Sequence, residues 1–424
     1  MKFDKKNIKA WIKKFALCRF IIKKIRIIKS VIVNNIKNIF FKYHLKKYFN
    51  QKDRKNNKIK VAFLCQMPEI WDKEVPLFES MKKSNDFFVE IIVVPAYDFV
   101  NKKIKYFYEK DNFFFQNYSE AIPALINGKW LNLKKRKYDY IFYQRPYNNY
   151  LPRGFRSSHV ISFAKCCYIP YAFWPLKEMI CGYNRDFFDS IYFAFIESEE
   201  NAAYLRTLGN YDNRVLFCGY PVLENITVTD DYLDDNGVLW TPRWSYGDKI
   251  GGSHFFEYKD KILEWQKNNP QMQLIIRPHP LAFENYLAEG LMTEDDIEKY
   301  KKSVFSTGAV FDDNKIIETT FKSTRVLISD ISSIMYPFFL TGKPIIYCNS
   351  GIAHSPSFEI LLKGVYIANK WEDVKEYLDK LNSGIDSLKS IREKIIKEIK
   401  NKHKDSTNRI VSSILNDYNE HHYI

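Results

Sequence analysis

Short apolar runs alternate with longer amphipathic stretches over most of the chain after residue 57. The runs are continuous rather than alternating, which is typical of parallel strands buried on both faces. Between them lie stretches with helical polarity, such as Glu199–Leu208, Phe256–Asn268 and Ser333–Thr341. This order of strand, helix and strand predicts a doubly wound α/β fold. The expected strands are Ile59–Cys65, Phe88–Pro95, Tyr138–Gln144, Tyr168–Phe173, Ser190–Glu197 and Arg214–Tyr220, followed by Val238–Trp244, Gln273–Pro278, Val310–Asp312, Arg325–Asp330, Pro344–Cys348 and Val365–Ala368.

The two series of strands predict two Rossmann-like domains that face a cleft. Their joint falls near Leu223–Gly237, which is rich in Asp and Asn. We therefore expect a basic segment at 1–57, a first domain at 58–225, a second domain at 236–385 and further helices at 386–424. Sheets of this kind bind ligands outside the carboxyl ends of their strands. Polar residues directly after each strand are therefore the candidates for a site.

The segment 1–57 differs from the rest of the chain in its charge. The first 60 residues hold 20 Lys and Arg but only two acidic residues, Asp4 and Asp53, which gives a net charge of +18. The whole chain carries +15, so the remainder carries −3. Because the folded domains are not basic, nucleic acid is not the expected partner of the body.

Isoleucines within this basic segment recur at steps of three or four and mark one face of a helix. They are Ile21, Ile25, Ile28, Ile32, Ile36 and Ile39. A basic amphipathic helix can lie in the headgroup layer of an anionic membrane. We expect residues 5–48 to hold a cytoplasmic protein peripherally on the inner face of the plasma membrane. A helix packed on the protein's own body and a nucleic-acid contact are the alternatives.

Composition limits the remaining classes of function. No secretory signal is visible, and basic residues interrupt Phe20 to Phe41, which cannot span a bilayer unaided. The seven cysteines show no Cys-x-x-Cys pair and indicate buried, reduced thiols. The eight histidines form no cluster with ligand spacing, so we expect no metal. Since no Gly-x-Gly-x-x-Gly occurs, no dinucleotide cofactor is expected.

The clearest polar constellation follows the run Arg325-Val-Leu-Ile-Ser-Asp-Ile-Ser-Ser333. We expect a strand to end at Ser329-Asp330 and a helix to begin at Ser332-Ser333. Free backbone N–H groups and two hydroxyls at such a turn can hold a phosphate or diphosphate. Ordinary capping of the helix by Ser332 or Asp330 is the alternative.

Two further strands end in residues that suit phosphate chemistry. Leu274-Ile-Ile-Arg-Pro-His-Pro280 delivers Arg277 and His279 to a strand end that two prolines fix. Leu239-Trp-Thr-Pro-Arg-Trp244 ends in Thr241 and Arg243, whose guanidinium fork fits phosphate. In the first domain, Tyr168–Lys177 and Phe217–Glu224 also end strands that point into the cleft.

Together these motifs resemble the CDP-glycerol glycerophosphotransferase family of teichoic-acid and capsule polymerases. The resemblance runs from about residue 138 to 350 and is most specific over 273–348. The matching motifs are, in order, Gly219-Tyr220-Pro221, Thr241-Pro242-Arg243, His279-Pro280, Asp330-Ile331-Ser332-Ser333 and Lys343-Pro344-Ile345. It implies a GT-B fold, a nucleotide-activated donor such as a CDP-alcohol or a nucleotide sugar, no required metal and a membrane-associated acceptor polymer.

One departure from the family pattern concerns the first domain. Where the family has Trp-His-Gly-Thr-Pro-Leu-Lys, this chain reads Tyr171-Ala-Phe-Trp-Pro-Leu-Lys177, with Ala172 in place of the histidine that resembles the acceptor-activating base. A general base must reach the proton that it removes. Glu178, His159 and Tyr171 are the possible substitutes.

We therefore expect a membrane-associated transferase that moves glycerol phosphate, or a related alditol phosphate, from a CDP-activated donor to a lipid-linked cell-envelope polysaccharide. We expect His279 and Arg243 to be catalytic. Tyr171, Lys177 and Glu178 are expected on the acceptor side, and the expected donor-binding residues are Thr241, Arg277, Glu318, Ser329, Asp330, Ser332 and Ser333.

Two other functions stay open at this point. One is a GT-B glycosyltransferase of capsule or lipopolysaccharide synthesis, which a panel of nucleotide-linked donors would separate. The other is a catalytically inactive scaffold of a polysaccharide assembly, which predicts no nucleotide binding. The missing family histidine is the only feature that favours the scaffold.

Overall fold

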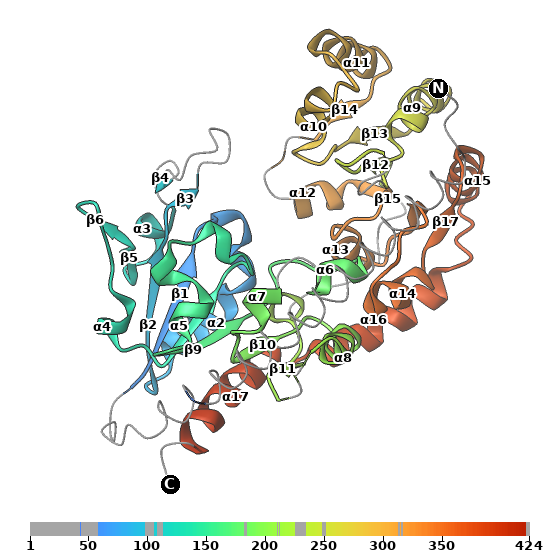
Figure 1. Cartoon of the computed structure of the whole chain (residues 1–424). Helices are drawn as coiled ribbons and strands as arrows, with labels where there is room; N and C mark the ends of the chain where they lie inside the picture. Colours follow the sequence, from blue (N-terminus) through green and yellow to red (C-terminus); the bar gives the residue numbers. More distant parts are fainter. Residues whose placement is uncertain are drawn as a thin grey trace, which may run out of the picture.

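A computed structural model describes Tyr43 and residues 58–420, except 98–105, 108–112, 182–184, 210, 212, 225–234, 248–251, 313 and 315–316. Its architecture is two parallel β-sheets in tandem, each covered by helices on both faces (Figure 1). Two further pairs of short strands, β3–β4 and β6–β7, are antiparallel. Their bounds are Ala96–Tyr97, Tyr106–Phe107, Leu125–Ile126 and Lys129–Trp130.

The first sheet has the strand order β11-β10-β9-β8-β1-β2-β5, and every neighbouring pair is parallel. Successive residues of β1 face opposite sides, because the side chains of a strand alternate. Val61 and Phe63 join one apolar cluster, and Ala62 and Leu64 join another. The strands are β1 Ile59–Cys65, β2 Phe87–Val93, β5 Ala121–Pro123, β8 Tyr140–Tyr143, β9 Lys165–Tyr168, β10 Phe193–Phe195 and β11 Val215–Leu216.

The second sheet has the order β14-β13-β12-β15-β16-β17 and is also parallel throughout. The chain builds outward from β12 first on one side and then on the other, so the order reverses at β12. A reversal of this kind opens a crevice at the carboxyl ends of the central strands. The strands are β12 Gly237–Thr241, β13 Gln273–Ile276, β14 Val310–Phe311, β15 Thr324–Ser329, β16 Ile345–Cys348 and β17 Tyr366–Ala368.

Helices cover both sheets and connect their strands. Those of the first domain are α2 Val75–Lys83, α3 Phe113–Asn117, α4 Leu133–Arg136, α5 Ser157–Val160, α6 Lys177–Cys181, α7 Arg185–Phe188 and α8 Glu199–Thr207. Those of the second are α9 Phe255–Asn268, α10 Ala282–Ala288, α11 Glu294–Ser306, α12 Ile317–Lys322, α13 Met335–Phe339, α14 Pro356–Leu362 and α15 Trp371–Asn382. Short 3-10 turns lie at Pro68–Lys73, Asn148–Tyr150, Arg153–Phe155 and Pro221–Leu223.

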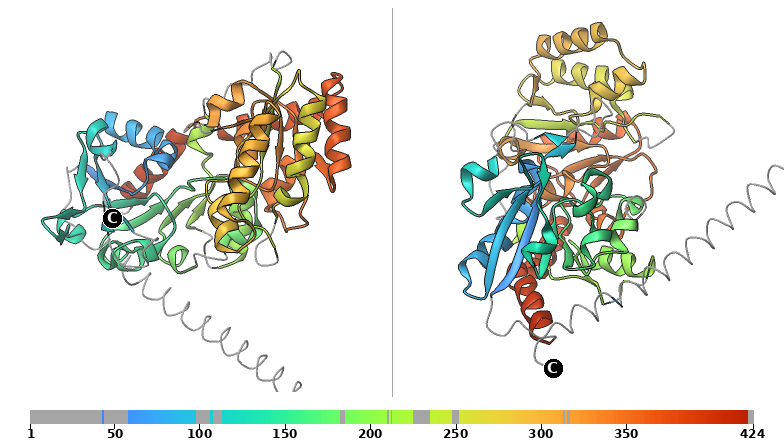
Figure 2. Two further views of the ribbon diagram at one scale, coloured as in Figure 1. Left: turned by 90° about the horizontal axis from the view of Figure 1, so that it is seen from above. Right: turned by 60° about the vertical axis from the view of Figure 1, so that its left-hand side comes forward.

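Two long helices at the end of the described chain connect the domains. Helix α16 (Lys389–His403) leaves the second domain, and α17 (Ser406–Glu420) packs against α2 of the first (Figures 1 and 2). Asp417 of α17 forms a buried ion pair with Lys165 and accepts hydrogen bonds from the hydroxyls of Tyr140 and Tyr192. The four-part division of the chain stays a prediction, and α17 adds its apolar face to the core of the first domain.

A glycine lies where the connection between α16 and α17 contacts the first domain. Gly219 has a φ of +84°, and a side chain there would collide with the hydroxyl of Ser406 at the start of α17. The next residue, Tyr220, donates its backbone N–H to Nδ1 of His403 at 2.9 Å. The segment Gly219-Tyr220-Pro221 therefore contacts the connection between α16 and α17.

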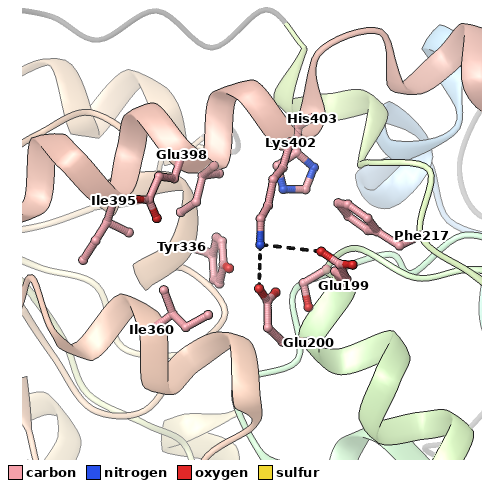
Figure 3. A pocket seen from close by; sticks show the side chains of 11 residues that line it. Glu199, Glu200, Phe217, Tyr336, Ile360, Ile395, Glu398, Lys402 and His403 are labelled. Atoms are coloured by element: carbon pink, nitrogen blue, oxygen red, sulfur yellow. Dashed lines mark hydrogen bonds and ion pairs between the residues drawn. The ribbon is translucent and has the colours of Figure 1, made fainter.

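The domains also touch directly along the segment that follows β9. The rings of Phe173 and Tyr336 stack with centroids 3.7 Å apart, and both side chains are buried. Leu176 forms an isolated β-bridge with His354 of the second domain. Beside this contact lies a cavity of about 50 Å³, where Lys402 of α16 meets Glu199 and Glu200 of α8 (Figure 3). Residues of four helices, α8, α13, α14 and α16, thus meet at one joint between the domains.

The expected doubly wound α/β fold is confirmed, and most of its strands lie where the apolar runs predict them. One expected strand is misplaced: the run Tyr168–Phe173 shares only Tyr168 with β9, which is Lys165–Tyr168. Pro170 ends the pairing there, because proline has no N–H to donate. The expected basic helix at 1–57 lies outside the described residues, apart from Tyr43. No helix in the described part of the chain is long and apolar enough to cross a membrane.

Candidate functional site

A cavity of about 200 Å³ lies at the carboxyl ends of β12, β13 and β15, where the order of the second sheet reverses. Three strand ends far apart in the sequence meet there, as the sequence predicts for a doubly wound sheet. Of the expected site residues, those that line it are Thr241, Arg243, Arg277, His279, Ser332 and Ser333. Pro175 and Met179 complete the wall from the first domain.

Arg243 is held in place along its whole length. Its backbone N–H donates to Oδ2 of Asp330 at 2.8 Å, Nε donates to Oγ of Ser245 at 2.8 Å, and Nη1 donates to the carbonyl of Ile331 at 3.0 Å. Gly252 lies against its side chain, since a Cβ there would come within 3.3 Å of Cδ of Arg243. A guanidinium fixed in this way meets an anion without first losing rotamer freedom.

Asp330 organises this part of the site and does not face the cavity. Its carboxylate is fully buried and accepts the backbone N–H groups of Arg243 and His254, and Oδ1 lies 2.7 Å from Nδ1 of His254. Burial opposes the charged form of His254, but the hydrogen bond and charge of Asp330 outweigh it and raise the pKa of the ring. Ser329 is buried too, and its Oγ accepts a hydrogen bond from the hydroxyl of Thr241 at 2.7 Å. The structure thus places Ser329 and Asp330 behind the site.

The turn after β15 differs from the sequence prediction. The helix α13 begins at Met335 and is five residues long, so it does not begin at Ser332-Ser333. Its N-cap is Ile334, which makes no side-chain cap bond. Pro337 opposes an earlier start of the helix, because it has no N–H to donate to the carbonyl of Ser333, four residues before it. Ser332 and Ser333 still line the cavity, but as residues of a turn rather than of a helix N-terminus.

His279 is exposed to the cavity and packs near Trp244, with ring centroids 6.2 Å apart. Desolvation and the charge of Arg243 lower the pKa of His279 to about 4, so the ring is neutral at pH 7. Nδ1 accepts the backbone N–H of Leu281 at 3.2 Å, which leaves the proton on Nε2. His279 therefore presents a neutral N–H donor, not a cation.

Arg277 lines the cavity, but its guanidinium already has partners within the second domain. Its Nη1 forms an ion pair with Asp312 at 2.6 Å and also donates to the carbonyl of Asn314. Burial works against ionisation of Asp312, but hydrogen bonds from Thr320 and Arg277 outweigh it and lower the pKa of the carboxyl. Glu318 lies in α12, and its side chain is outside the described residues.

A second cavity of about 790 Å³ lies between the domains. Arg243, Trp244 and Met179 line both cavities, so the two spaces adjoin. Of the residues expected on the acceptor side, Tyr171 and Glu178 line the larger cavity. Lys177 does not, because its ammonium group lies over the ring of Tyr204 at 5.3 Å.

Several residues of the larger cavity are absent from the sequence prediction, among them Asp186, Tyr147 and Asn148. Asp186 does not follow a strand end, and its Oδ2 accepts a hydrogen bond from the side-chain amide of Asn148 at 3.3 Å. Tyr147 hydrogen-bonds the hydroxyl of Tyr171 at 2.9 Å. The polar run Gln144–Tyr150 directly follows β8. The rule that polar residues directly after a strand are site candidates, here called the strand-end rule, would therefore have found Tyr147 and Asn148.

His254, Asp330 and Cys348 form a cluster whose potential ligand atoms lie within 4.8 Å of one another. Asp330 already accepts hydrogen bonds there from His254 and from two backbone N–H groups. Burial and the nearby Asp330 charge raise the pKa of the Cys348 thiol, which keeps its proton. These contacts fit a hydrogen-bonded support for the strand ends.

Comparison with known proteins matches this half of the chain to a family. The profile of CDP-glycerol:poly(glycerophosphate) glycerophosphotransferases matches residues 203–416, which contain every second-domain residue of the site. The chain belongs to this family. It is accordingly a transferase of the CDP-glycerol glycerophosphotransferase type. No curated protein matches it by sequence.

Solved structures of low sequence identity share the fold. The wall teichoic acid polymerase TagF aligns with a TM-score of 0.52 and 15% identity over 92% of this chain and 98% of its own. MnaA of S. aureus, solved with UDP, aligns with a TM-score of 0.56 and 14% identity over 86% and 97%. The UDP-GlcNAc 2-epimerase of Neisseria meningitidis aligns with a TM-score of 0.52 and 12% identity over 85% and 100%. The fold is of the GT-B type, as the resemblance implied.

Proposed function

We propose that this protein transfers glycerol phosphate, or a related alditol phosphate, from a CDP-activated donor to a lipid-linked polysaccharide of the cell envelope. The observation that carries the proposal is the convergence of Arg243, His279, Ser332 and Ser333 on one cavity within the region that matches the family. A variant of TagF was solved after a soak with CDPG, which supports a donor of this class for the shared fold.

The diphosphate of the donor would lie between Arg243 and the Ser332-Ser333 turn. The guanidinium supplies positive charge, and the two hydroxyls supply donors without a metal ion. When the acceptor oxygen attacks the phosphorus next to glycerol, the bond to the CMP oxygen breaks. Nε2–H of His279 would then donate to the charge that develops on the leaving phosphate.

The acceptor would enter through the larger cavity. Its wall combines aromatic rings with carboxylates, namely Tyr147, Tyr150, Tyr171, Trp174 and Trp244 with Glu178 and Asp186. Rings and carboxylates suit the apolar faces and hydroxyl groups of a sugar. Residues 5–48 would bring this cavity to a lipid-linked polymer by resting on the anionic inner face of the plasma membrane.

The nucleotide that is released tests this proposal. The full chain is incubated with an isolated lipid-linked acceptor and, in separate reactions, with CDP-glycerol, another CDP-linked alditol, a UDP-linked sugar and a CMP-linked sugar. Transfer of an alditol phosphate releases CMP from the CDP donors, which is the expected result. Release of UDP with the UDP-linked sugar, and no CMP with the CDP donors, would instead identify a glycosyltransferase.

Calorimetry with CDP and CMP provides the control for an inactive protein. The proposal expects both nucleotides to bind and the Arg243→Ala variant to bind more weakly. Absence of binding to the folded wild-type protein would favour a scaffold of the polysaccharide assembly.

A further inference from the structure

The chain lacks the family histidine that resembles the acceptor-activating base. Ala172 stands at the position of the family histidine, and a methyl group cannot accept a proton. Among the substitutes, His159 lies on α5, where its ring packs against Phe163, and it lines neither cavity. Tyr171 lines the larger cavity, but its hydroxyl is already hydrogen-bonded to the hydroxyl of Tyr147 at 2.9 Å.

We propose that Glu178 is the general base of the reaction, and this inference rests on the transfer function proposed above. Two carboxylates line the larger cavity among the residues that the structure describes, Glu178 and Asp186. A carboxylate is ionised at neutral pH and can accept a proton directly from a hydroxyl group. The choice between the two depends on where each lies relative to the smaller cavity, in which the donor would bind and which is called the donor cavity below.

Glu178 lies on α6, which borders both cavities. It is in the first turn of α6, and the next residue, Met179, lines both spaces. Pro175, three residues before Glu178, lines the donor cavity as well. The position of this segment is fixed, because Ser355 of the second domain donates its backbone N–H to the carbonyl of Pro175 at 2.8 Å. Glu178 is thus held where an acceptor hydroxyl would approach the donor.

Asp186 has a different setting. It lies on α7, and its carboxylate accepts a hydrogen bond from Asn148, which is itself bonded to Ser157. These partners all belong to the first domain, and none of them lines the donor cavity. Glu178, by contrast, is exposed and has no hydrogen bond or ion pair with any of the described residues. Its carboxylate oxygens are therefore open to a ligand.

The proposed step balances in atoms and charge. The acceptor O–H gives its proton to the carboxylate of Glu178, and its oxygen forms a bond to the phosphorus that carries the glycerol group. The bond from this phosphorus to the CMP oxygen breaks, and CMP leaves with the electron pair. The protonated Glu178 then returns its proton to solvent when the products depart.

The test compares Glu178→Gln and Glu178→Ala with the wild-type full chain, using CDP-glycerol and the lipid-linked acceptor. Both variants should bind CDP as the wild type does but lose about 100-fold or more in kcat, the contribution of a positioned base. Glu372→Gln is the matched control, because Glu372 is also an exposed carboxylate in the first turn of a helix, α15. It should retain wild-type kcat.

Two readouts separate a base from a residue that only shapes the cavity. Formate should restore part of the activity of Glu178→Ala but none of that lost by Arg243→Ala. The acid limb of the wild-type pH profile should disappear in Glu178→Gln. The other titratable groups that line the cavity with Glu178 are Tyr147, Tyr150, Tyr171, Asp186 and Arg243.

Several results would overturn the proposal. A Glu178→Gln variant that keeps more than a tenth of the wild-type kcat would overturn the role of Glu178 but leave the proposed transfer function intact. Formate rescue of Asp186→Ala but not of Glu178→Ala would move the role to Asp186. If the wild-type chain releases no CMP from any CDP donor, the proposed function itself fails, and this outcome is distinct from the other two.

Discussion

Replacement of His279 by alanine should remove transfer and leave the fold intact. The side chain is exposed, so few packing contacts are lost. The backbone N–H of Leu281, which Nδ1 accepts, is also at the surface, where water can replace the ring. Surface substitutions of this type usually change the free energy of unfolding by less than about 0.5 kcal/mol. The thermal transition of His279→Ala should therefore coincide with that of the wild type.

The expected loss of rate follows from the state of the ring. Because the pKa of His279 is lowered to about 4, the imidazole acts as a neutral donor and does not add a full charge to the site. Loss of one such donor to a developing anion costs about 100- to 1,000-fold in kcat, or about 3–4 kcal/mol. Glutamine can place an N–H near the position of Nε2, so His279→Gln should retain more activity than His279→Ala.

Single-turnover release of CMP measures this prediction without interference from product dissociation. His159→Ala is the matched control, because His159 is also exposed and lines neither cavity. Because the ring is already neutral at pH 7, titration of His279 should not lower the rate between about pH 7 and pH 5.5. The pH profiles of the wild type and of His279→Gln should therefore have the same shape in this range. The reasoning about His279 would be refuted if His279→Ala kept more than a tenth of the wild-type rate, or if His159→Ala lost as much.

The other predictions concern stability and the membrane. Burial raises the pKa of Glu197 from 4.5 to about 7, so the folded state binds this proton more tightly; the stability gained is complete below about pH 4.5 and is lost as the pH rises through about 7. Glu197→Gln should remove this pH dependence, on the order of 3 kcal/mol, in urea unfolding curves recorded between about pH 5 and pH 8, and an unchanged slope would contradict it. Asp417→Asn should lower the free energy of unfolding by about 3–5 kcal/mol in the same assay, because it leaves Lys165 buried without its ion pair. A loss below about 1 kcal/mol would show that the pair is not buried in solution. Deletion of residues 1–57 should abolish sedimentation with anionic vesicles but not CDP binding, and vesicle binding by the deleted chain would refute the assignment of that segment.

Much of the fold could be predicted from local pattern. Buried parallel strands are apolar without interruption, so eleven of the twelve expected runs overlap a strand of the two sheets by two residues or more, and the run Tyr168–Phe173 shares only Tyr168 with β9. The failure at β9 has a physical cause. Its first residue, Lys165, is charged and looks like a loop residue, yet it is buried because Asp417 pairs with it from the far end of the chain. No local pattern contains a contact across 252 positions.

The candidate site could be predicted only in its outline. The strand-end rule found Arg243, His279 and the Ser332-Ser333 turn, since topology alone brings the ends of neighbouring parallel strands together. It could not separate residues that face the cavity from those that support it, because Asp330 and Ser332 are two positions apart and differ in burial. The role of His254 depends on a hydrogen bond to Asp330 across 76 positions, and only the structure shows it.

The return of α17 to the first domain affects how the chain is made. Ile410 and Ile414 of this helix belong to the same apolar core as β1 and β2, which leave the ribosome long before them. Until α17 emerges, the nascent first domain exposes part of that core and depends on protection from aggregation. A ribosome that stops before α17 therefore yields a chain that contains every described strand of the two sheets but lacks this part of the first domain's core. Folding of the first domain can thus be completed only after α17 has been translated.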